Sequence, residues 1–110
     1  MKLLYLSRSR YGGWVTFTTH LYHGLVGKQP TTHNPLNRSD DHEVIRVTNR
    51  TEKTYRNMGN YVPYRNMCEE DILDIEEPFL ITALDKHHRE FGMKLLEKGA
   101  TIVIHDPTEL

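Results

Sequence analysis

The chain has 110 residues and a formal net charge of −1, because 14 lysines and arginines nearly balance 15 aspartates and glutamates. This length suits one domain with one core, and the balanced charge excludes a global field that would draw the chain onto DNA or an anionic membrane. The single cysteine, Cys68, excludes an intrachain disulfide, and no apolar run is long enough to span a bilayer, so we expect a cytoplasmic protein.

The first part of the chain predicts a strand, a helix and a long loop. Residues 3–6 form a short continuous apolar run, which is typical of a strand buried on both faces. From Trp14 onward apolar residues recur every three to four positions, which predicts an amphipathic helix that ends before Pro30. Residues 28–42 are polar and aperiodic and predict a loop long enough to be functional. The predicted inner face of the helix consists of Val15, Thr18 or Thr19, Tyr22, Leu25 and Val26.

The middle of the chain is more polar. Residues 44–48 are rich in β-branched side chains and predict a second strand. The polar stretch 49–60 predicts a second loop, and residues 61–64 are a weaker strand candidate because Pro63 cannot donate a ladder hydrogen bond. Acidic residues followed by isoleucine and leucine predict a short helix over 69–75.

The last part of the chain repeats the alternation of strand and helix. Residues 78–84 are a continuous apolar run and predict a buried strand. Asp85 is the expected N-cap of a helix that stops at Gly99. Residues 101–104 predict the final strand, and His105 follows it directly.

Strands that alternate with helices predict right-handed βαβ units and a parallel sheet. The expected fold class is α/β: a single Rossmann-like domain over residues 1–110, built as a three-layer sandwich with a small, mainly parallel sheet of four to five strands. In such sheets ligands bind beyond the carboxyl ends of the strands. The candidate functional segments are therefore residues 7–13, 84–85 and 105–106.

A glycine pair, Gly12-Gly13, lies between the first predicted strand and the first predicted helix. Glycine lets backbone N–H groups approach a phosphate, and a helix N-terminus adds partial positive charge. Arg8 and Arg10 in the same loop favour an anion contact, although neither a G-x-G-x-x-G pattern nor a Walker A lysine is present. The alternatives are a simple turn made by the glycines and a solvated pair of arginines.

The pair His105-Asp106 follows the final predicted strand. A histidine there can serve as a general base or bind a substrate, since an imidazole exchanges protons near neutral pH. The alternative is that His105 covers the sheet edge while Asp106 begins a turn before Pro107.

Two other patterns suggest different chemistry. Seven histidines raise a metal hypothesis, but the chain has neither an H-E-x-x-H motif nor a cysteine pair, so no metal site is expected. The tetrapeptide Tyr-Arg-Asn-Met occurs at 55–58 and again at 64–67, and such residues can stack on bases and contact phosphates. The alternative is a chance repeat or a local surface patch, and the acidic residues 69–71 would oppose a polyanion.

Several of these features together resemble the N-terminal domain of GT-B glycosyltransferases. That family commonly begins with a strand, a Gly-Gly loop, a helix, and Gly-His-Glu-Val before the second strand. Here Gly12-Gly13 occupy the loop, and His42-Glu43-Val44 open the second predicted strand with Asp41 in place of the glycine. The closing run 102–106, Ile-Val-Ile-His-Asp, resembles a later strand of the family that ends in a histidine reaching the cleft.

The resemblance implies a domain that faces a second Rossmann-like domain across a cleft, with a nucleotide-sugar as donor substrate and no separate cofactor. Gly12 and Gly13 match the loop near the donor phosphates, and we place Arg8 with them. His105 matches the cleft histidine and is the expected catalytic residue, with Arg10 and Asp106 on the acceptor side. The second domain would hold most of the donor.

The leading hypothesis is therefore the acceptor-side domain of an enzyme that moves a sugar from a nucleotide-sugar to an acceptor hydroxyl, inactive alone. One alternative is a non-enzymatic Rossmann-like binding or regulatory module. Another is a small nucleic-acid binder that uses the two Tyr-Arg-Asn-Met segments. A nucleic acid is also a conceivable acceptor for the transferase.

Overall fold

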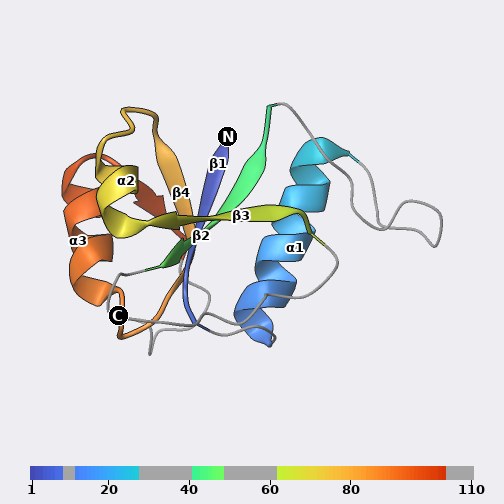
Figure 1. The fold of residues 1–110 in the computed structure, drawn as a ribbon. Coiled ribbons are helices and arrows are strands. Elements are labelled where there is room, and N and C mark those ends of the chain that lie inside the picture. The colour runs from blue at the N-terminus through green and yellow to red at the C-terminus, as the bar shows by residue number, and fades with distance from the viewer. Residues whose placement is uncertain (9–11, 28–40, 49–61, 104–110) are drawn as a thin grey trace.

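The computed structural model describes residues 1–8, 12–27, 41–48 and 62–103 (Figure 1). Strands and helices alternate along these residues. In chain order the elements are β1 (Lys2–Leu6), α1 (Gly13–Val26), β2 (Glu43–Thr48), β3 (Tyr64–Cys68), α2 (Glu69–Leu73), β4 (Phe79–Leu84), α3 (Arg89–Glu97) and β5 (Thr101–Ile102).

The strands form one sheet in the order β3-β2-β1-β4-β5, and every pairing is parallel. This order matches the doubly wound Rossmann order 3-2-1-4-5-6 without its sixth strand. Helix α1 covers one face of the sheet, while α2 and α3 cover the other (Figure 1). The predicted α/β class, the small parallel sheet and the three-layer Rossmann-like arrangement are confirmed.

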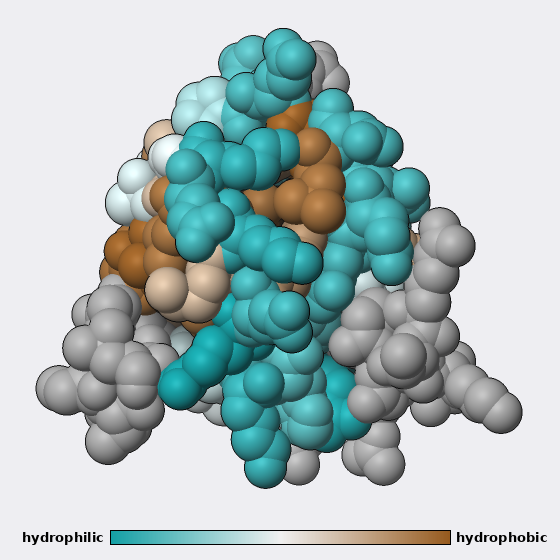
Figure 2. Space-filling view, turned by 90° about the vertical axis from the view of Figure 1, so that its left-hand side faces the viewer, coloured by the Kyte–Doolittle hydropathy of each residue, from teal (hydrophilic) through white to brown (hydrophobic). Residues whose placement is uncertain are grey.

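Side chains alternate between the two faces along the central strands, so the core has two halves. On the α1 side, Leu3 and Tyr5 of β1 pack with Val15 and Tyr22 of the helix. On the other side, the buried residues come from three strands and two helices and include Leu4, Leu6, Ile45, Val47, Ile72, Ile81, Phe91 and Leu95. The outer surface of α2 and α3 is mostly hydrophilic, with a smaller exposed apolar area (Figure 2). Met93 of α3 is among its exposed residues.

The inner face of α1 differs in part from the sequence prediction. Val15, Thr18 and Tyr22 are buried as expected, and the choice between Thr18 and Thr19 falls on Thr18. His23 is also buried, with its ring edge-on to Tyr22 at a centroid distance of 5.3 Å. Leu25 and Val26 are half-buried and pack against the same cluster of the core.

Several element boundaries were wrongly predicted. Helix α2 ends at Leu73 rather than at residue 75. Strand β3 begins at Tyr64 rather than ending there, because Pro63 has no N–H to pair with β2. Helix α3 begins at Arg89 with His88 at its N-cap position, so Asp85 is not the cap. The carboxylate of Asp85 instead accepts hydrogen bonds from the backbone N–H groups of Arg8 and His87. The predicted stop at Gly99 is confirmed, since its φ of 101° lies in the left-handed region.

Candidate functional site

The carboxyl ends of the strands meet at one edge of the sheet, the lower edge in Figure 1, which we call the carboxyl edge. Strands β1 and β4 are neighbours there, but β1 leads to α1 on one face and β4 leads to α3 on the other. The two connections that leave these neighbouring strands therefore run to opposite faces of the sheet. In open parallel sheets, ligands bind at this kind of topological switch point.

Asp85 connects the two loops that leave the switch point. Its Oδ2 accepts the N–H of Arg8 at 2.9 Å, and its Oδ1 accepts the N–H of His87 at 2.9 Å. Its own N–H donates to the carbonyl oxygen of Leu6 at 2.9 Å. One half-buried carboxylate therefore fixes the first residues after β1 against the first residues after β4.

The side chains of Arg8 and His87, whose backbones are both held by Asp85, contact each other. Nη2 of Arg8 contacts Nε2 of His87. A guanidinium has only donors, so the imidazole nitrogen is the acceptor in this contact. Two side chains that can both carry positive charge are thereby directed to one point at the carboxyl edge.

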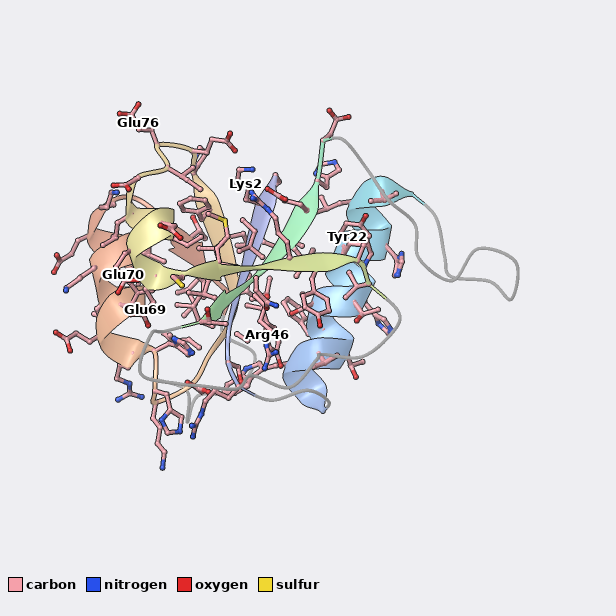
Figure 3. All side chains as sticks on the ribbon, in the orientation of Figure 1. Lys2, Tyr22, Arg46, Glu69, Glu70 and Glu76 are labelled. Atoms are coloured by element: carbon pink, nitrogen blue, oxygen red, sulfur yellow. The ribbon has the colours of Figure 1, made fainter. Side chains whose placement is uncertain are left out.

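A second arginine, Arg46, contacts the backbone of Arg8. Arg46 of β2 is fully buried, and its Nη2 donates to the carbonyl oxygen of Arg8 at 3.4 Å. Figure 3 shows Arg46 on the α1 side of the sheet, toward the carboxyl edge. The neighbouring phenol of Tyr5 is also buried, and burial raises its pKa to about 12, opposed by a hydrogen bond with Ser7 and by the charge of Arg46.

Helix α1 begins at the same edge. Gly12 at its N-cap position has a φ of 108°, a conformation that L side chains rarely adopt, so this turn requires glycine. The carbonyl oxygen of Gly12 accepts the first helical hydrogen bond, from Thr16 at 3.0 Å. The remaining N–H groups of the first turn give the edge partial positive charge.

The edge is also positively charged in its side chains. Lys86 and Arg89 are exposed between β4 and α3, where Asp85 is already engaged by two N–H groups. Exposed acidic residues follow α2, and Figure 3 shows Glu76 at the opposite end of the molecule. Exposed basic side chains therefore lie close to the switch point in the chain.

The sequence-predicted site residues fall into two groups. Arg8, Gly12 and Gly13 lie at the carboxyl edge, as expected of the loop between β1 and α1. Arg10, His105 and Asp106 lie outside the described residues. Sequence reasoning missed His87 and Arg46. It placed Asp85 in a candidate segment at this edge but assigned its side chain to a helix cap. A signal for His87 was available, because it follows a predicted strand end by three residues.

Another histidine pairs with a carboxylate at the start of α3. The imidazole of His88 is fully buried, and its Nδ1 lies 2.9 Å from Oε1 of Glu69 at the start of α2. This pair joins the two helices on one face of the sheet. Across residues 1–8, 12–27, 41–48 and 62–103, no group of three His, Cys, Asp or Glu side chains is arranged to hold a metal ion.

The second Tyr-Arg-Asn-Met segment lies within β3, and the first lies outside the described residues. Arg65 makes a two-pronged contact with Glu43 of β2, with Nε–Oε2 and Nη2–Oε1 distances of 2.9 Å. Its hydrogen bonds lower the pKa of Glu43. Since a carboxylate already occupies this guanidinium, the segment is poorly suited to contact phosphates.

Comparison with known proteins adds no further identification. No family model matches the chain, and neither does any curated protein or solved structure. Within the part of the chain that is described, none of the helices has the length and apolar character needed to cross a membrane.

Proposed function

We propose that the chain forms the N-terminal, acceptor-side domain of a nucleotide-sugar-dependent glycosyltransferase, with its carboxyl edge facing the diphosphate and the transferred sugar. The observation that carries the proposal is the position of Arg8. The backbone of this arginine is held by Asp85 at the switch point between β1 and β4.

The chemistry of the edge favours a phosphate ligand. A guanidinium matches phosphate oxygens in geometry and charge, and the N-terminus of a helix attracts the same anion. The turn at Gly12 brings backbone close to such a ligand without a Cβ between them. Lys86 and Arg89 add long-range attraction for an anionic donor.

In the proposed reaction, the bond between the anomeric carbon and the diphosphate oxygen breaks, and the acceptor oxygen bonds to that carbon. Negative charge develops on the departing nucleoside diphosphate, where Arg8 would stabilise it. The acceptor hydroxyl loses its proton to a base, a role we assign to His105. A second Rossmann-like domain would hold the nucleoside, so the 110-residue chain should bind the donor weakly and not turn it over.

The proposal is tested by titrating the ¹⁵N-labelled chain with UDP-glucose and with GDP-mannose while recording amide chemical shifts. We expect millimolar binding of at least one donor, with shifts concentrated at Arg8, Gly12, Gly13 and His87. Arg8→Gln should weaken binding about tenfold, as expected for loss of a charge-assisted contact. Lys94→Gln, which removes an exposed charge on α3, is the matched control.

Two results would overturn the proposal. One is the absence of binding by either donor. The other is binding whose shifts map away from the carboxyl edge and whose affinity is the same in Arg8→Gln as in Lys94→Gln.

A further inference from the structure

We infer that His87 is the second arm of the anion site, that it closes on the same diphosphate as Arg8, and that it gains a proton when the ligand binds. The inference rests on the proposed function, because it takes the nucleotide-sugar diphosphate as the ligand. It assigns to His87 a role that nothing in the sequence pattern assigned.

The placement of His87 supports this role. Its backbone N–H is fixed by Oδ1 of Asp85, and the other oxygen of the same carboxylate fixes the backbone of Arg8. The two side chains then meet through Nη2 and Nε2. The two hydrogen bonds accepted by Asp85 therefore position the side chains of Arg8 and His87, and Asp85 acts as a positioning residue for this pair.

Hydrogen-bond chemistry links the ligand to the proton. Without a ligand, Nε2 of His87 directs its lone pair at Arg8. An ionised diphosphate has only acceptors, so an imidazole that turns toward it has to donate. The protonated imidazole donates from both nitrogens and adds a positive charge toward the anion.

The charged groups near His87 also favour the binding of an anion. Arg8 faces this histidine from the end of β1, and Lys86 and Arg89 flank it in the chain. These three cations place positive charge near the imidazole, which attracts an anionic ligand to this point. The carboxylate of Asp85 is engaged with the N–H groups of Arg8 and His87. Glu90 is exposed in the first turn of α3. A diphosphate placed between Arg8 and His87 would add negative charge next to the imidazole and so favour its protonated form.

The side chains of Arg8 and His87 match two non-bridging oxygens of a diphosphate. Arg8 would take one oxygen from the β1 side, and His87 would take another from the β4 side. A ligand without the diphosphate, such as uridine, offers neither oxygen and should not bind at this edge.

The test uses UDP-glucose, because its diphosphate stays ionised and does not itself titrate between pH 6 and pH 8. Wild-type affinity should be several-fold higher at pH 6 than at pH 8, since an imidazole changes charge within this range. His87→Gln keeps a donor but cannot take up a proton. It should weaken binding about fivefold at pH 6 and abolish the difference between the two pH values.

His20→Gln is the matched control, because His20 is exposed on α1 and the same change is made there. It should leave both the affinity and its pH dependence unchanged. The Cε1–H resonance of His87 in the wild-type chain gives an independent readout, and at pH 7 it should move toward its protonated position when UDP-glucose is added. Amide spectra of each variant check that the fold is intact.

The outcomes separate this inference from the proposed function. If Arg8→Gln loses affinity while His87→Gln keeps both the affinity and the pH dependence of the wild type, the role of His87 is overturned and the proposed function stands. If the wild-type chain binds neither UDP-glucose nor GDP-mannose at either pH, both are overturned.

Discussion

Thr18 on α1 donates a hydrogen bond of 2.8 Å from its Oγ1 to Oγ1 of Thr82 on β4, and both residues are fully buried. Thr82 is the extra residue of a β-bulge, because Leu4 pairs with Ile81 while Tyr5 pairs with Ala83. The bulge directs Thr82 toward α1, where its hydroxyl also contacts the carbonyl oxygen of Leu4 at 3.4 Å. A polar bridge thereby fixes the helix above the strand that leads to Asp85.

Replacing Thr82 by valine should therefore destabilise the protein. The change keeps the shape of the side chain but leaves the Thr18 hydroxyl buried without its acceptor, which costs about 1–3 kcal/mol. Urea unfolding of the wild type and Thr82→Val measures the difference. Thr101→Val, at an exposed position of β5, is the control and should change stability by less than about 0.5 kcal/mol. The double variant Thr18→Val, Thr82→Val should cost less than the sum of the single changes, because neither hydroxyl is then left buried without its partner.

Because of the ion pair between Glu43 and Arg65, the free energy of unfolding should decrease as the pH falls into the acid range. Hydrogen bonds from Arg65 hold the pKa of Glu43 below its ordinary value, with Lys2 adding to the effect. A lowered carboxyl pKa stabilises the folded state above the pKa of the unfolded chain, and this contribution is lost as pH falls through the folded value. Since the two side chains are 31% and 52% exposed, Glu43→Gln should cost less than about 1 kcal/mol at pH 7.

Urea unfolding at pH 7 and pH 3 tests this expectation. The stability difference between the wild type and Glu43→Gln should be smaller at the lower pH, because the wild-type carboxyl takes up its proton as the pH falls. Glu76→Gln, on the exposed loop after α2, is the control and should show no such convergence. An equal difference at both pH values would contradict the role of the charge.

The sequence contains the signals for the strands of the sheet centre, but not for its edge. Residues 3–6 and 78–84 are apolar on both faces, because helices cover both sides of the sheet, and a continuous apolar run predicts this directly. Residues 44–48 are interrupted by Arg46 and were predicted from their β-branched side chains. Strand β3 is an edge strand with Arg65 and Asn66 exposed, so its composition is that of a loop. Its pairing with β2 became visible only in three dimensions.

The candidate site was predictable where it depends on local chain order and not where it depends on distant contacts. Gly12 and Arg8 follow a predicted strand, and parallel topology places every such segment at one edge. The role of Asp85 depends on the N–H of Arg8, which is 77 residues away in the chain. Before that contact is known, an aspartate that precedes a helix by a few residues is most simply interpreted as its N-cap.

Tyr5 should make stability fall in alkaline solution. Burial raises the pKa of its phenol to about 12 from the ordinary value of 10.0. The stability that comes from the neutral phenol is fully present below pH 10, and it is lost as pH rises from 10 to 12. Tyr5→Phe cannot ionise, so its stability should decline less steeply over this interval.

Urea unfolding at pH 8, 10 and 11 measures the two slopes. At pH 8 the variant should be less stable by about 1 kcal/mol, because its hydrogen bond with Ser7 is lost, and the difference should narrow as the pH rises. Absorbance at 295 nm gives a second readout. Compared with the folded wild type, Tyr5→Phe should lose one tyrosine from the component that ionises above pH 11. Parallel slopes for the two proteins would count against the buried phenol.

Two helical glycines should respond in opposite directions to alanine. In a helix interior, alanine is favoured over glycine by about 1 kcal/mol. At Gly24 of α1 an added Cβ meets nothing within 4 Å, so Gly24→Ala should stabilise the protein by about 0.5–1 kcal/mol. At Gly92 of α3 an added Cβ would lie 2.7 Å from Cδ1 and 3.0 Å from Cδ2 of Leu84, a buried residue of β4. Overpacking there should outweigh the helix propensity and destabilise the protein by about 1 kcal/mol.

A double-mutant cycle in urea identifies Leu84 as the cause of the loss at Gly92. Leu84→Ala alone should cost about 2–4 kcal/mol by leaving a cavity. In that background Gly92→Ala should become neutral or stabilising, because the atoms that it would overlap are gone, and the two changes should then be strongly non-additive. If Gly92→Ala costs the same with and without Leu84, the contact between α3 and β4 is not what requires glycine. If it stabilises the wild type as Gly24→Ala does, the helix lies farther from the strand than the structure places it.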